Sequence, residues 1–218
     1  MFRYLVIVVL VGLIGGCAAP GPQGPKKTQA QIILAGITTS YSSAPQARSL
    51  IDTAIAEART AAEQAALAAK RPGDGKWLDQ YTLNIRHAIN PVSGDKGLPG
   101  LGYGVRRATK EIMRQMELAA KSPDASVALK GQAPRVNRMG KNVLGWCTKI
   151  DGLINQLAKE EQSRSRKKLL KDLKDYTSRL VEGFDKNRDG LVTWRRGEGG
   201  LVVIADHLQV LEENPNGF

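Results

Sequence analysis

The chain has 218 residues, of which 32 are Lys or Arg and 21 are Asp or Glu, for a formal charge of +11. This length is enough for one or two small domains with a hydrophobic core. Outside its first residues, no apolar run approaches the ~20 residues of a transmembrane helix, which excludes a bundle of membrane-spanning helices.

The first 17 residues have the pattern of an export signal. Arg3 precedes an apolar run from Leu5 to Ile14, which is too short to span a bilayer as a helix but has the size of a signal-peptide core. The run ends in Ile14-Gly15-Gly16-Cys17, which resembles the lipobox of bacterial lipoproteins. The resemblance implies a signal peptide at 1–16 and a lipid on Cys17. The alternatives are an ordinary secretory signal and an uncleaved anchor.

The same resemblance implies a place in the cell. Acyl chains on Cys17 would hold the protein on a membrane of the bacterial cell envelope. Because Ala18 and not Asp follows the cysteine, we expect the outer membrane, with the protein facing the periplasm. There the excess of cations favours contact with lipid headgroups, lipopolysaccharide or cell-wall acids. Because of this location we expect no nucleic-acid partner. Residues 17–28, rich in Pro, Gly and Lys, predict a flexible tether.

Helical periodicity begins directly after the tether. Residues 29–37 fit either a short helix or a strand, and we expect a helix because no other segment offers a sheet partner. An alanine-rich amphipathic helix is predicted from about 45 to 70, with Pro45 at its start. The next helix is expected to begin after Asp74 as N-cap and to end before Pro91.

The middle of the chain continues this pattern. Residues 91–104 are dense in glycine and lack the motif of a nucleotide-binding loop, so they predict a tight connection between helices. A helix at 105–121 follows, then a short helical piece that we expect to break near Pro134, and then a regular apolar stripe from 136 to 157. The sequence therefore predicts an all-α fold, with an up-and-down helical bundle over 29–158.

Three side chains that could react or bind a metal lie in or beyond this bundle. Cys147 lies beside the apolar stripe, which predicts a buried small hydrophobe, and with Cys17 lipidated no internal disulfide is possible. Neither His87 nor His207 has a nucleophile or acid at motif spacing, so we expect no enzyme.

The remaining residues, 159–218, predict a helix-loop-helix module. Two apolar stripes flank the loop DKNRDGLVTWRR at 185–196; the first comprises Leu169, Leu173, Tyr176, Leu180 and Phe184, and the second Leu201, Ile204, Leu208 and Leu211. Loop and flanks together resemble a single EF-hand. The resemblance implies that calcium is held by side-chain oxygens of Asp185, Asn187 and Asp189, by the carbonyl of Leu191, and through a water on Thr193.

The loop departs from the EF-hand pattern at its twelfth position. Arg196 stands where a glutamate would close the site. Three glycines, at 197, 199 and 200, discourage a helix there, so we expect the last helix to begin near Leu201 and the longer loop to turn Glu198 toward the ion. The hypotheses are a calcium site with an affinity of ~0.1 to 1 mM, typical of extracellular modules, a metal-free turn, or a site for another cation or a chance match.

These features predict a cell-envelope lipoprotein in which calcium stabilises or exposes a protein-interaction surface. The apolar face of the last helices is expected to pack on the bundle, on a second copy of the chain or on another protein. The alternative is a metal-independent helical scaffold that binds a partner or the cell wall.

Overall fold

The computed structural model describes residues 27–92 and 97–213, and every regular element in these ranges is helical. The all-α prediction is therefore confirmed. The signal peptide, Cys17 and nearly all of the tether lie outside the described residues. No described helix is both long and apolar enough to cross a membrane. The helices are α1 (Gln29–Thr38), α2 (Leu50–Ala68), α3 (Gly75–Ile89), α4 (Val105–Lys121), α5 (Val127–Leu157), α6 (Ser163–Glu182) and α7 (Leu201–Glu213).

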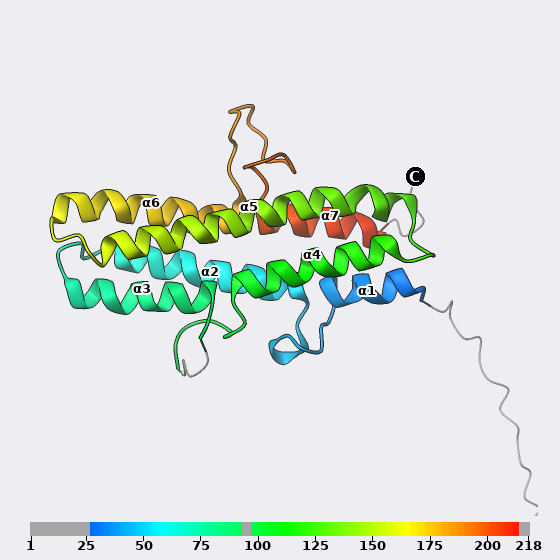
Figure 1. Ribbon diagram of the computed structural model, residues 1–218, viewed down its shortest axis with the longest axis horizontal. Helices are drawn as coiled ribbons and strands as arrows, with labels where there is room; N and C mark the ends of the chain where they lie inside the picture. Colours follow the sequence, from blue (N-terminus) through cyan, green and yellow to red (C-terminus); the bar gives the residue numbers. More distant parts are fainter. Residues whose placement is uncertain (1–26, 93–96, 214–218) are drawn as a thin grey trace, which may run out of the picture.

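The helices form an elongated up-and-down bundle of four rows (Figure 1). The rows are α1 followed by α2, α3 followed by α4, α5 alone, and α6 followed by α7, and each row packs along the next. The backbone N–H of Ala30 donates to the Asp124 carboxylate, so the start of α1 is tied to the turn between α4 and α5. The first described residues therefore lie at the end of the bundle where α5 begins.

Three of the four rows are interrupted midway by a loop. The connections are 39–49, 90–104 and 183–200. Figure 1 shows 183–200 projecting from the opposite side of the bundle to 39–49 and to the described parts of 90–104. Since α5 alone runs the full length, it contacts both halves of the last row, α6 and α7.

Local capping explains where two of the helices begin. The carboxylate of Asp74 accepts the N–H of Trp77 at 3.1 Å, which confirms the predicted start of α3. The start of α2 lies later than predicted, since Ser49 caps it by accepting the N–H of Asp52 at 3.0 Å. Pro45 instead opens a 3₁₀ turn, Pro45–Ala47.

The predicted break at Pro134 is wrong, because α5 runs through this residue without interruption. A proline inside a helix costs about 3 kcal/mol, since it removes one hydrogen bond and crowds the preceding turn. Leu129 and Ala133 are buried before the proline, and Val136 and Met139 after it. Burial of one continuous face on both sides outweighs the local cost.

A buried carboxylate ties the glycine-rich loop to the bundle. Glu57, on α2, is fully buried. Its Oε1 accepts the N–H groups of Tyr103 at 2.8 Å and Gly104 at 2.9 Å, and its Oε2 accepts that of Leu101 at 3.1 Å. Because Gly104 precedes α4 and offers no side-chain cap, Glu57 serves as the anion at the start of that helix.

The second polar contact of note lies near the connection 39–49. Glu111, on α4, accepts hydrogen bonds from Arg114 and from the Tyr41 hydroxyl. These bonds, the one from Arg114 above all, lower the pKa of Glu111 from 4.5 to about 2.

The C-terminal helices complete the same hydrophobic core. Leu201, Ile204, Leu208 and Leu211 are buried as the stripe predicted, and α7 packs on α5, α2 and α6. Of the stripe predicted before the loop, Leu173 and Leu180 are buried, Leu169 and Tyr176 are partly buried against the core, and Phe184 is 39% exposed. The buried face of α6 also includes Leu170, Thr177 and Val181. Cys147 is buried, and burial raises the pKa of its thiol to about 12.

Candidate metal-binding loop

The loop 183–200 leaves and rejoins the bundle through a narrow neck. The N–H of Phe184 donates to the carbonyl of Glu198 at 2.8 Å, which closes the loop. Gly183 has a φ of 84°, and a Cβ there would lie 2.4 Å from the same carbonyl oxygen. A Cβ on Gly200 would lie 2.4 Å from the nitrogen of Gly183. The two chain segments of the neck therefore approach so closely that both positions, 183 and 200, require glycine.

The first half of the loop folds around the carboxylate of Asp185. Its Oδ1 accepts the N–H groups of Arg188 at 2.7 Å and Asp189 at 3.2 Å, and its Oδ2 accepts that of Gly190 at 2.9 Å. Arg188 and Gly190 both have positive φ, 61° and 84°. Three successive N–H groups thus converge on one carboxylate, and of its two oxygens Oδ2, which accepts a single bond, keeps a free lone pair.

Asn187 and Asp189 face each other across this turn. The Asn187 amide donates to Asp189 Oδ2 at 2.8 Å, and Asp189 Oδ1 accepts the N–H of Leu191 at 2.9 Å. The Arg195 guanidinium lies 3.4 Å from Asp189 Oδ2. The Leu191 N–H, then the Asn187 amide, and finally the charge of Arg195 lower the pKa of Asp189.

The second half of the loop brings Glu198 to Thr193. Glu198 is only 2% exposed, and its Oε2 accepts the Thr193 hydroxyl at 2.6 Å and the Thr193 N–H at 3.3 Å. Arg196 is exposed. The last helix begins at Leu201, as the three glycines predicted. The residue proposed to replace the missing glutamate therefore lies against the ninth position of the loop, and the arginine lies outside.

Helix α5 holds this second half in place. The side chain of Asn142 accepts the N–H of Gly197 at 2.8 Å and donates to the carbonyl of Arg195 at 3.1 Å. The Trp194 ring lies under the guanidinium groups of Arg135 and Arg138, at 5.3 and 5.1 Å. Sequence reasoning missed Asn142, because nothing in its local pattern connects it to a loop more than 50 residues later.

The chemistry of the loop suits a hard cation, since all the candidate ligands are oxygens. The structure does not gather the acids into one group, however: nowhere in 27–92 or 97–213 do three Asp, Glu, His or Cys side chains form a cluster that could hold a metal. Glu198 is engaged by Thr193, and Asp189 by Asn187 and Arg195. Binding of an ion by all six predicted ligands would require these contacts to open.

Neither histidine lies in this loop. His207, on α7, has its Nδ1 2.7 Å from the Oε1 of Gln132, and burial lowers the pKa of its imidazole. His87 is buried in α3, close to the glycine-rich loop.

Comparison with known proteins adds no assignment. No protein-family model, curated protein or solved structure matches the chain. Any function must therefore be argued from the residues and their geometry.

Proposed function

We propose that this protein is a bacterial cell-envelope lipoprotein whose loop 183–200 binds calcium weakly. The lipid on Cys17 anchors it to the membrane, with the bundle in the periplasm. The motif at 14–17, the Pro- and Gly-rich residues that follow and the charge of +11 support this location. The protein is not an enzyme in this proposal.

The observation that carries the calcium proposal is the turn around Asp185. Three consecutive N–H groups point at its carboxylate, so the chain already curls as it must to place alternate residues around one point. Asp185, Asn187 and Asp189 supply side-chain oxygens to the ion, and Leu191 supplies its carbonyl oxygen. Thr193 and Glu198 supply the oxygens on the opposite side of the ion.

Calcium bound in this loop acts on the bundle through the neck. The ion offsets the charges of Asp185, Asp189 and Glu198 and strengthens the connection between α6 and α7. The apolar face of α7 is already covered by the bundle. The interaction surface that calcium orders is therefore the outside of the loop, where Leu191 is 63% and Val192 36% exposed.

A metal-independent scaffold is the second candidate, and one observation favours it. Each side chain of the set has protein partners: Asp185 three N–H groups, Asp189 the Asn187 amide and Arg195, and Glu198 the Thr193 side chain. A loop held in this way keeps its shape without an ion and presents the same surface to a partner.

Calorimetry with calcium chloride separates the two candidates. All the described helices and their core lie within residues 27–213, so the chain beginning at residue 27 is the sample. We expect heat of binding and a midpoint of thermal unfolding that rises with calcium. No binding at about 10 mM calcium, well above the weakest affinities of extracellular sites, leaves the scaffold as the function.

Two variants locate the ion. Asp185→Asn is expected to abolish calcium binding. Glu198→Gln is expected to weaken it at least tenfold; an unchanged affinity would mean that the first half of the loop binds the ion alone. Mass spectrometry of the native N-terminus tests the anchor, because an unmodified Cys17 contradicts it.

A further inference from the structure

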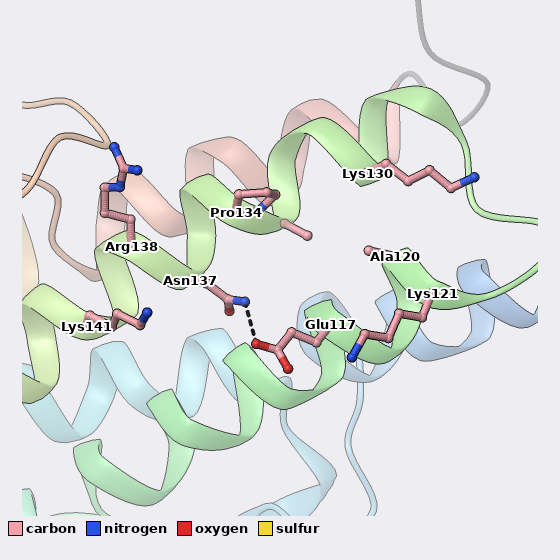
Figure 2. A pocket seen from close by; sticks show the side chains of 9 residues that line it. Glu117, Ala120, Lys121, Lys130, Pro134, Asn137, Arg138 and Lys141 are labelled. Atoms are coloured by element: carbon pink, nitrogen blue, oxygen red, sulfur yellow. Dashed lines mark hydrogen bonds between the residues drawn. The ribbon is translucent and has the colours of Figure 1, made fainter.

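An open cleft of about 530 Å³ lies between α4 and α5, near the end of the bundle where α1 begins. Its lining carries four cations, Lys121, Lys130, Arg138 and Lys141, and a single acid, Glu117. Figure 2 shows the side chains of Lys121 and Lys141 approaching the cleft from opposite ends, while the charged ends of Lys130 and Arg138 point away from it.

The cations of the cleft are not neutralised by the protein. Over 27–92 and 97–213, none of the four forms an ion pair, although Arg138 also lies over the Trp194 ring. Glu117 is turned to Asn137, whose amide donates to its Oε1 at 2.9 Å (Figure 2). The residues that line the cleft therefore carry an excess of three positive charges, which attracts an anion.

On each helix an exposed apolar residue lies one turn from a lysine that lines the cleft. Leu118 is 44% exposed and precedes Lys121 by one turn of α4, while Val127 is 79% exposed and precedes Lys130 by one turn of α5. Neighbouring cations and exposed apolar groups suit the region where phosphate headgroups meet acyl chains.

We propose that the cleft between α4 and α5 is a binding site for a phosphate ester, such as the glycerol phosphate headgroup of an anionic lipid. The phosphate binds to Lys121 and Lys141, the two lining lysines whose side chains approach the cleft. This site is separate from the loop 183–200 and does not depend on calcium.

Two probes distinguish the sources of this headgroup chemistry. Glycerol 1-phosphate, titrated by calorimetry into the chain beginning at residue 27, tests the free ester. Vesicles of phosphatidylglycerol in phosphatidylcholine, followed by co-sedimentation, test the lipid. Binding to both means that the headgroup alone suffices, and binding to one identifies the source. Binding to neither overturns the proposal.

Paired variants separate the cleft from net charge. Lys121→Gln with Lys141→Gln is expected to weaken binding about 25-fold, roughly fivefold for each lysine beside a phosphate. Lys149→Gln with Lys168→Gln removes the same charge from exposed positions on α5 and α6 and should change binding less than twofold. Equal losses in the two pairs would show general charge attraction and overturn the site.

A gain of binding guards against variants that merely fail to fold. Glu117→Gln removes the one acid of the cleft and keeps an oxygen for Asn137, so affinity should rise about threefold to fivefold. Glu63→Gln, at an exposed position of α2, makes the same change in net charge and should leave affinity unchanged. No gain for Glu117→Gln over Glu63→Gln contradicts the assignment.

Discussion

Replacing Glu57 by glutamine tests whether a buried carboxylate fixes the loop before α4. The variant keeps the size of the side chain but removes its charge and turns an NH₂ group toward one of three donors. Oε1 accepts two N–H groups at 2.8 and 2.9 Å, and Oε2 accepts the third at 3.1 Å. Hydrogen bonds to a charged group contribute about 1.5 to 3 kcal/mol each.

We expect Glu57→Gln to lower the free energy of unfolding by about 2 to 3 kcal/mol. One hydrogen bond is lost outright, and the charge that favoured the N-terminus of α4 is lost with it. For a chain of this size the midpoint of thermal unfolding should fall by about 5 to 10 °C. Urea unfolding followed by circular dichroism measures the free energy directly.

The matched control is Glu63→Gln, six residues further along the same helix but exposed. It should change the free energy of unfolding by less than about 0.5 kcal/mol. If the two variants lose the same stability, the hydrogen bonds from Leu101, Tyr103 and Gly104 do not stabilise the fold, and the reasoning is refuted.

Three further predictions concern charge. Arg195→Gln should raise calcium affinity about tenfold in calorimetry, because a cation ~5 Å from a divalent ion costs about 1.7 kcal/mol even in water. The same substitution at Arg196 should raise the affinity less. Equal gains in affinity for the two variants would contradict the contact between Arg195 and Asp189. The pKa of Glu111 is lowered to about 2, so its stabilisation is present above pH 4.5 and is lost as the pH falls toward 2. Between pH 4.5 and 2, the free energy of unfolding of Glu111→Gln should therefore fall by about 1 to 2 kcal/mol less than that of the unchanged protein, allowing for solvent screening. Identical falls in the two proteins would contradict this prediction. With a thiol pKa of about 12, Cys147 should react with a thiol reagent at pH 8 only on unfolding, and rapid labelling of the native protein would contradict its burial.

Helix-forming periodicity predicted most of this fold, and the failures have physical causes. Asp74 and Pro91 act through neighbours in sequence, so the limits of α3 followed from local rules. Pro134 disfavours a helix locally, but burial of the apolar face of α5 keeps the helix continuous through it. Where packing against residues far along the chain outweighs a local free-energy cost, the sequence alone indicates only the local cost.

The candidate loop was also predictable only in part. The turn around Asp185 and the start of α7 at Leu201 depend on residue spacing and glycine, which the sequence displays. The partners of the loop do not: Asn142 reaches it from α5, and Arg195 approaches Asp189 only through the fold. The cleft between α4 and α5 was likewise invisible, because its cations come from two helices and look like ordinary solvated positions in each.

The single unbroken helix sets how far the protein reaches. At 1.5 Å per residue, the 31 residues of α5 span about 46 Å. Because α1 begins at the same end as α5, a lipid on Cys17 would hold that end nearest the bilayer. The turns at 69–74 and 158–162 would then stand about 46 Å farther from the membrane. A chain anchored in this way offers a headgroup site close to the lipid and a loop halfway out, two surfaces at two depths of one compartment.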